Sequence, residues 1–166
     1  MSELHLTTHK HYSEREAFDR ITQLPCWSGR IEIDTLEGGL TNSNFLVKQK
    51  REKFVVRLAD DIPELNIARW HEIGASRAAS AIGISPEVIF DDVGVIVLRF
   101  IEGRTLRAED IGEVRVLKSI INILQECHLK LLKEWSGPVL AFWPFHIARG
   151  NGNWILNRDA DFIGLW

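Results

Sequence analysis

The sequence predicts an α+β fold, in which a five-stranded antiparallel sheet with one inserted helix is followed by a helical extension. Three observations carry this prediction. Five short, apolar, strand-like runs occur between residues 30 and 100. A helical stripe interrupts the series after the third run, and the pattern after Gly103 is helical. We therefore divide the chain into an N-terminal unit, residues 1–103, and a C-terminal unit, residues 104–166.

A short leading helix is expected over residues 13–24. Residues 13–16, Ser-Glu-Arg-Glu, match a capping box, in which the first and last side chains each accept a hydrogen bond from the other's backbone. Apolar residues follow at helical spacing as far as Leu24, and Pro25 ends the pattern.

The sheet and its inserted helix are expected over residues 30–100. Gly38-Gly39 ends the first strand, and the charged stretch QKREK is typical of a hairpin tip between the second and third. The inserted helix is expected to open near Pro63 and to end near Gly83. The expected strands are 30–37, 44–50, 53–60, 86–90 and 95–100.

The core of the N-terminal unit should be built from alternating strand residues and from the inserted helix. A second, longer helix is expected over residues 112–132, with its apolar residues near one face. The expected core residues are Ile31, Ile33, Phe45, Val47, Val55, Leu58, Ile73, Val88, Ile89, Val97 and Leu98.

Composition excludes several kinds of partner. Twenty Lys and Arg against 23 Asp and Glu give a net charge of −3, with no basic face to attract nucleic acid. No apolar run reaches the ~18 to 20 residues of a membrane span, and the N-terminus lacks a signal-peptide core. Cys26 and Cys127 lie far apart, so we expect neither a disulfide framework nor a zinc site. We expect a cytoplasmic protein without nucleic-acid or membrane partners.

The order of elements is similar to the small lobe of protein-kinase-like phosphotransferases. A glycine-rich turn between two strands lets backbone N–H groups approach phosphate oxygens. Such enzymes need a cation on the third strand and a carboxylate on the following helix, and Arg57 and Glu72 occupy these places. Taken singly, the glycine pair fits an ordinary turn, Arg57 an outward strand position and Glu72 a solvated helix charge. The three together, in this order, favour the phosphate site.

The resemblance becomes more specific in five segments. They are similar to the choline/ethanolamine kinase branch of the aminoglycoside-phosphotransferase-like family, over roughly residues 30–150. The segments are GGLTNSNF (38–45), FVVRL (54–58), NIARWHEI (66–73), VLRFIEG (97–103) and LQECH (124–128). This likeness implies a kinase-like small lobe over 1–103, and a fragment of the helical large lobe over 104–166.

The resemblance also implies an ATP site. Arg57 and Glu72 would support the phosphates, and the backbone of Arg99, Phe100 and Ile101 would meet the adenine edge. The acceptor would be a small alcohol, with choline favoured over ethanolamine, thiamine, sugars and aminoglycosides. The phosphate loop would comprise Gly38, Gly39, Leu40, Thr41, Asn42, Ser43 and Asn44.

The catalytic part of the family pattern is missing from this chain. Complete members carry a catalytic Asp in an H-x-D-x-x-x-x-N loop, and its Asn plus a later Asp bind Mg²⁺. One alignment places HIARGNGN (146–153) there, with Ala148 at the Asp position, and FIGLW (162–166) at the later motif. The alignment that we favour ends the chain before the loop. Under both, the catalytic and metal-binding Asp residues are absent, so we assign no catalytic and no metal-binding residue.

Two functions follow from these observations, and a third stays open. The chain is by family an ATP-dependent phosphotransferase, inactive as it stands, or else a non-catalytic nucleotide-binding or interaction module, either a pseudokinase or a truncated gene product. Truncation would expose apolar surface on residues 116–132 and 139–156, which favours self-association. The third interpretation is an α+β domain without a nucleotide role, in which Arg57 and Glu72 would not face each other.

Overall fold

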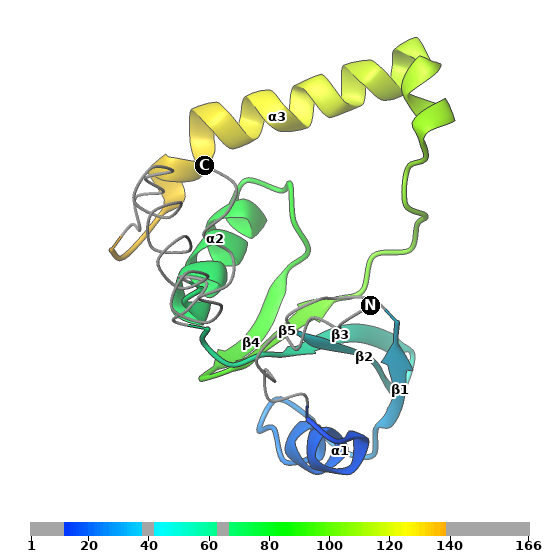
Figure 1. Cartoon of the computed structure of the whole chain (residues 1–166), viewed down its shortest axis with the longest axis vertical. Coiled ribbons are helices and arrows are strands. Elements are labelled where there is room, and N and C mark those ends of the chain that lie inside the picture. The colour runs from blue at the N-terminus through cyan, green and yellow to red at the C-terminus, as the bar shows by residue number, and fades with distance from the viewer. Residues whose placement is uncertain (1–11, 38–41, 63–66, 139–166) are drawn as a thin grey trace, which may run out of the picture.

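The computed structural model describes residues 12–37, 42–62 and 67–138, which form a five-stranded antiparallel sheet with a helix on each face and a long helix beyond (Figure 1). The strand order is β1-β2-β3-β5-β4, which confirms the predicted α+β fold. The elements are α1 (Glu14–Thr22), β1 (Glu32–Leu36), β2 (Ser43–Gln49), β3 (Glu52–Leu58), α2 (Arg69–Ala81), β4 (Val88–Asp92), β5 (Val95–Arg99), the 3₁₀ helix η2 (Ala108–Gly112) and α3 (Val114–Glu134).

The leading helix α1 begins with the predicted capping box. The backbone N–H of Glu16 donates to the Ser13 hydroxyl, and the backbone N–H of Ser13 donates to the Glu16 carboxylate at 3.0 Å. These two bonds satisfy backbone groups that the first turn of a helix leaves without partners. The helix ends at Thr22, two residues before the expected boundary.

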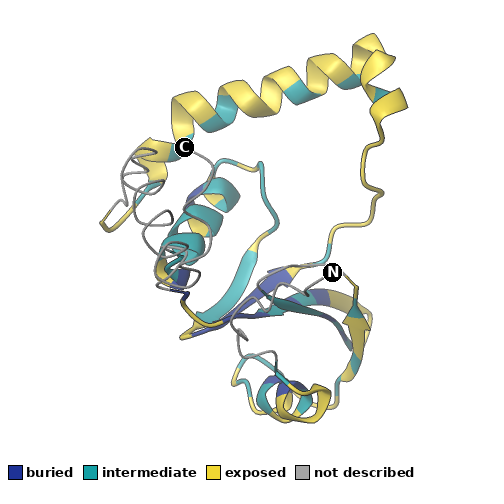
Figure 2. Cartoon of the chain, in the orientation of Figure 1, coloured by how far each residue is buried: buried dark blue, intermediate teal, exposed yellow. Residues whose placement is uncertain are grey.

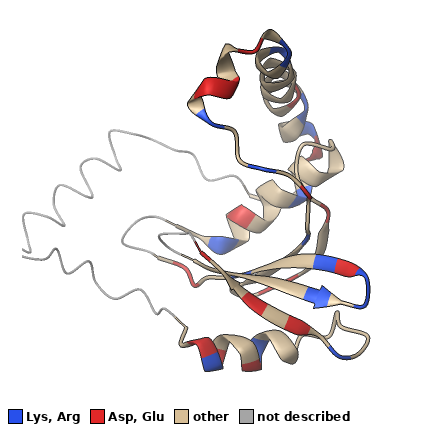
Figure 3. Ribbon diagram, turned by 90° about the vertical axis from the view of Figure 1, so that its right-hand side faces the viewer, with Lys and Arg blue, Asp and Glu red and all other residues tan. Residues whose placement is uncertain are grey.

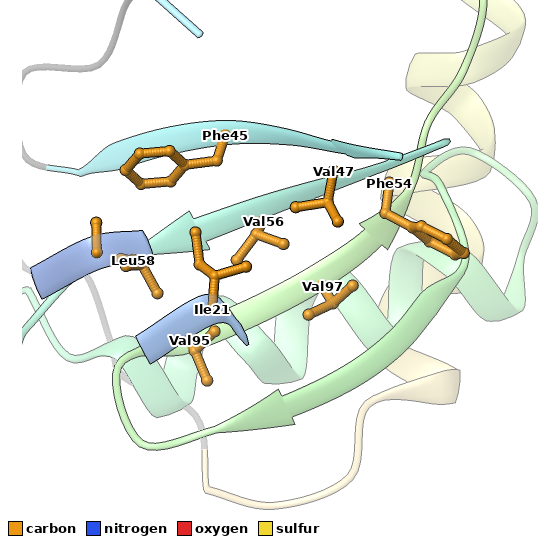
Figure 4. Packing of buried hydrophobic residues seen from close by; sticks show 9 residues of the cluster. Ile21, Phe45, Val47, Phe54, Val56, Leu58, Val95 and Val97 are labelled. Atoms are coloured by element: carbon orange, nitrogen blue, oxygen red, sulfur yellow. The ribbon is translucent and has the colours of Figure 1, made fainter. Parts of the chain in front are cut away.

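The main core lies between the sheet and α1. Ala17 and Ile21 of α1 are fully buried, and they join buried residues of β2, β3 and β5 in one cluster (Figure 4). Residues of both charges are interspersed along the strands and helices (Figure 3). The strand members of the cluster are Phe45, Val47, Phe54, Val56, Leu58, Val95 and Val97.

The expected core was right for only part of its members. Phe45, Val47, Leu58, Val97 and Leu98 are buried. Val55 is not buried as expected: it is half-buried, alternates with the buried Phe54 and Val56, and lies on the face that carries Arg57. The other five are also only half-buried, because they lie on or next to the edge strands β1 and β4, or on α2: Ile31, Ile33, Ile73, Val88 and Ile89.

The strand bounds and the turn of the β4–β5 hairpin differ from the prediction. β4 runs to Asp92, because Asp91 and Asp92 pair with Ile96 and Val95 instead of forming the turn. The turn itself narrows to Val93 and Gly94, and Gly94 adopts a φ of +69°. A positive φ costs glycine little, so this residue allows the tighter connection.

Helix α2 starts later than expected. Ile62 and Ile67 form an isolated β-bridge, so Ile67 is extended and the helix begins at Arg69. Pro63, where the helix was expected to open, lies outside the described residues. The end is close to the prediction: the N–H groups of Gly83 and Ile84 donate to Ser80 and Ala79, which is the Schellman pattern of a glycine that follows a helix.

Helix α3 covers the predicted 112–132 segment and is largely exposed (Figure 2). None of its residues is buried, which confirms the expected apolar exposure for 116–132; residues 139–156 lie outside the described part of the chain. Its end meets α2 through Trp135, whose ring lies 3.1 Å from where a Cβ on Gly74 would be. No described helix combines the length and apolarity of a membrane span.

The β4–β5 turn leads to a stability prediction. A Cβ on Gly94 would lie 3.1 Å from the carbonyl oxygen of Ala59, so Gly94→Ala should destabilise the fold by about 2–3 kcal/mol, from the unfavourable φ and the clash together. Gly83→Ala is the matched control, because Gly83 also has a positive φ, +76°, but a Cβ added there would meet no atom within 4 Å. It should cost only about 1 kcal/mol.

Urea unfolding of both variants measures the difference. Equal losses of unfolding free energy would show that close packing at the β4–β5 turn contributes nothing beyond the backbone conformation.

Candidate functional site

Arg57 and Glu72 form an ion pair across the space between β3 and α2. Nη1 of Arg57 donates to Oε1 of Glu72, and the two side chains are only 33% and 26% exposed. The expectation that they face each other is therefore confirmed, contrary to what the interpretation without a nucleotide role predicted. A strand cation held by a helix carboxylate is the arrangement that kinase-like sites require.

Asn44 ties Arg57 to the end of the predicted phosphate loop. Asn44 and Arg57 are directly opposed in the β2–β3 register, so their side chains share one face of the sheet. Nε of Arg57 donates to Oδ1 of Asn44 at 3.3 Å. Arg57 therefore holds both the strand that follows the loop and the carboxylate of α2.

Arg69 is a second cation on the same carboxylate. Its Nη1 donates to Oε2 of Glu72 at 2.9 Å, so each carboxylate oxygen accepts from a different arginine. Burial would raise the pKa of Glu72, but hydrogen bonds and charge from Arg57 and Arg69 outweigh it and hold that pKa below its ordinary value. Glu72 is therefore ionised at neutral pH.

The space beside the Arg57–Glu72 ion pair is narrow. The pocket lined by Arg57, Arg69, Glu72 and neighbouring residues has room for about 10 Å³, which is about one water molecule. A wider groove of about 520 Å³ lies past Arg69, but it is lined by Asp60, Asp61 and further carboxylates. Acidic walls repel phosphate, so a nucleotide would have to lie on the open side of Arg57.

The predicted phosphate loop is described only in its second half. Gly38, Gly39, Leu40 and Thr41 lie outside the described residues. Asn42 precedes β2, and Ser43 and Asn44 begin it, all three half-buried. The structure therefore brings the end of the loop, through Asn44, next to Arg57.

The predicted adenine edge is brought less clearly into the site. The backbone N–H groups of Arg99 and Phe100 already donate to the carbonyls of Glu87 and Lys53, at 2.9 and 3.0 Å. The Arg99 side chain pairs with Glu52 and Glu87 and lies over the ring of Phe54, a residue of the α1-side core. Ile101, the third residue of this segment, is 62% exposed.

Arg69 belongs to the motif NIARWHEI, but sequence reasoning gave it no role in the site. The signal that could have revealed a role was its position three residues before Glu72, a spacing that places two helical side chains on one face. Both residues lie inside the expected helix, so this spacing was available, but the burial of Arg69 and its bond to Asp60 were not.

No metal centre is found in the described ranges, which contain no group of three or more His, Cys, Asp or Glu arranged for a metal ion. Residues 146–153 and 162–166, where the catalytic and metal motifs were sought, lie outside those ranges. His128 is exposed on α3.

Comparison with solved structures shows which fold this is. The chain is similar to an ethanolamine kinase from Plasmodium vivax at 22% identity, with a TM-score of 0.50 over 74% of this chain and 31% of the other. It is similar to a choline kinase from Cryptosporidium parvum Iowa II at 20% identity, with a TM-score of 0.55 over 70% of this chain and 36% of the other. The chain thus spans about a third of each structure. No family model and no curated protein matches the sequence. At these identities the likeness establishes a kinase-like fold.

The ionised state of Glu72 predicts how stability depends on pH. Since its pKa is lower in the folded than in the unfolded state, its contribution is fully present above the unfolded pKa of about 4.3 and is lost as pH falls through the lower folded pKa. Glu72→Gln should cost about 1–3 kcal/mol of unfolding free energy at pH 7, and this cost should shrink below about pH 4.3.

Urea unfolding across this pH range tests the prediction. Glu126→Gln is the control, because Glu126 pairs with Lys130 on the exposed helix α3 and such a pair contributes little. A Glu72→Gln cost that stays constant with pH would contradict the assignment.

Proposed function

We propose that the α2-facing side of the sheet binds the phosphate groups of ATP. The observation that carries this proposal is the Arg57–Glu72 ion pair, because it joins the third strand to the following helix at the positions where kinase-like folds hold a nucleotide. The solved structures with this fold are named as choline and ethanolamine kinases. This likeness supports a phosphotransferase origin with a small alcohol acceptor, such as choline. In this proposal residues 1–103 form the nucleotide-binding unit, and residues 104–166 are part of a helical lobe.

Arg57 suits this role because its guanidinium has more donors than its protein contacts use. Nε serves Asn44 and Nη1 serves Glu72. In the described part of the chain Nη2 contacts no acceptor, and the side chain is 33% exposed. Nη2 would therefore donate to a phosphate oxygen, which accepts strong charge-assisted hydrogen bonds from arginine.

Two further parts complete the proposed site. Backbone N–H groups of the glycine-rich loop, Gly38 to Asn44, would surround the phosphates, and the backbone near Ile101 would meet the adenine edge. Complete kinases bring Mg²⁺ to the phosphates with carboxylates. We assign no residue of this chain to the metal.

We further propose that this chain alone does not transfer a phosphoryl group. None of its six His residues is followed two positions later by Asp, and Ala148 occupies that place in the one candidate loop. Alanine cannot orient an acceptor hydroxyl, and positioning with metal electrostatics supplies nearly all of phosphoryl-transfer catalysis. The chain would bind ATP weakly in the reducing cytoplasm, where its two described cysteines stay unpaired.

Nucleotide binding is tested by removing the Arg57 guanidinium. Arg57→Met keeps much of the apolar stem but loses the donors, so ATP affinity measured by calorimetry should fall by about tenfold or more. Arg77→Met is the control, because Arg77 lies on the same helix as Glu72 but pairs with Asp91 and is 59% exposed. Its affinity for ATP should match that of the wild type.

Two results would overturn the proposal. If the wild-type chain shows no thermal shift and no calorimetric signal at millimolar ATP, the nucleotide role fails. If it releases ADP in response to choline or ethanolamine, and Arg57→Met abolishes that release, the proposed inactivity fails.

The exposed face of α3 favours a second role, as a surface for self-association. Leu117, Ile121 and Leu124 follow one another at helical spacing and are 42%, 44% and 50% exposed. A stripe of this kind on a globular domain is typical of an interface. We propose that two copies of the chain associate through this stripe.

Sedimentation velocity tests the association. The wild type should sediment as a dimer at tens of micromolar, roughly the range of a modest apolar interface, and Ile121→Glu should sediment as a monomer. Ser119→Glu, on the same helix but outside the stripe, should leave the dimer intact. A wild-type monomer throughout this range would exclude the interface.

A further inference from the structure

Arg69 is the one charged side chain that is buried among the described residues, with 8% of the residue exposed. Burying a guanidinium is costly unless charge and hydrogen bonds compensate it. Arg69 therefore either binds a ligand or serves the structure, and its contacts distinguish the two.

The Arg69 guanidinium joins α2 to the end of β3. Its Nη1 donates to Oε2 of Glu72 at 2.9 Å, and its Nε donates to the backbone carbonyl of Asp60 at 2.9 Å. Asp60 lies two residues after β3, the strand that carries Arg57. The Arg69 guanidinium thus connects the Glu72 carboxylate to the segment that follows β3, the strand on which Arg57 lies.

The backbone of Arg69 is held at the same place. Helix α2 has Ala68 at its N-cap and receives no capping hydrogen bond from that side chain. The N–H of Arg69 instead donates to Oδ1 of Asp61 at 2.6 Å, so a carboxylate from the preceding segment satisfies a first-turn donor. Arg69 is bound to two consecutive residues, Asp60 through its side chain and Asp61 through its backbone.

Helix α2 makes other contacts near Glu72, through the ring of Trp135, which lies against His71 and Gly74. Its other buried residue is Ala78, more than two turns beyond Arg69, and Arg77, which pairs with Asp91, is 59% exposed. These contacts do not involve the Glu72 carboxylate, which accepts from Arg57 and Arg69.

We propose that Arg69 is a positioning residue, which holds the Glu72 carboxylate in front of Arg57 and does not itself contact the nucleotide. Its Nε and Nη1 are both engaged by the protein, and its side chain is 10% exposed against 33% for Arg57. Without Arg69, Glu72 keeps only the Arg57 ion pair among the described residues, so its carboxylate is held through one oxygen instead of two. The effect on nucleotide binding rests on the proposed function, whereas the effect on Glu72 does not.

The first test measures Glu72 in the whole chain without nucleotide. Carboxyl ¹³C NMR follows the titration of Glu72 in Arg69→Met, in Arg69→Lys and in the control Arg77→Met. Loss of one of the two cations that lower the pKa of Glu72 should shift its midpoint upward in Arg69→Met. Lysine keeps the positive charge but lacks the planar guanidinium that can bind two groups at once, so Arg69→Lys should shift the midpoint of Glu72 by less. Arg77→Met should match the wild type.

An unchanged midpoint in Arg69→Met would overturn the positioning role. If Arg69→Met does not fold, Arg69→Lys decides: a wild-type midpoint together with wild-type ATP affinity would show that the two-point contact of arginine is not needed. If the wild type binds no ATP, the proposed function fails while the titration still decides how Glu72 is held.

The second test separates positioning from direct contact with ATP. Arg69→Met should weaken ATP binding by about tenfold or more, and Arg69→Met combined with Glu72→Gln should bind ATP no more weakly than Glu72→Gln alone. Such non-additivity is expected when one residue acts through another. Additive losses would assign Arg69 to the nucleotide itself, and an unchanged affinity in Arg69→Met would break the link to the site; either result overturns the proposal.

Discussion

The attachment of α2 to the sheet depends on one shared carboxylate. Two guanidinium groups, from Arg57 on β3 and Arg69 on α2, lie in a half-buried space where they would repel each other without Glu72 between them. Because each takes a different oxygen, the carboxylate fixes both cations. Polar contacts therefore connect the first turn of the helix to the sheet on this side of the molecule.

Sequence reasoning found the parts of this arrangement that element order determines. Arg57 and Glu72 could be paired because the third strand and the next helix are adjacent in a small antiparallel fold. It failed where geometry within an element decides. Val55 was expected to be buried, but a run of Phe, Val and Val has no alternation to show which residues enter the α1-side core. Arg69 gained no role because its burial and its contacts with Asp60 and Glu72 do not follow from the sequence alone.

The kinase-like fold does not by itself assign a chemical reaction to this chain. A fold hosts many functions, and function belongs to sites; here the site comprises a cation, its carboxylate and the end of a loop. The chain spans about a third of the kinase structures that it resembles, and α3 has no buried residue. The proposed nucleotide binding therefore depends on Arg57 and its neighbours, and the proposed acceptor is a small alcohol.

The two faces of the sheet carry different kinds of residues. Ala17 and Ile21 of α1 close the apolar core on one face, while the polar residues around Glu72 occupy the other. Alternate residues of a single strand thus have different surroundings: Val56 lies in the apolar core, and Arg57 pairs with Glu72. Substitutions of two neighbouring residues therefore have separate effects: those of Val56 change the α1-side core, and those of Arg57 change the contacts of Glu72.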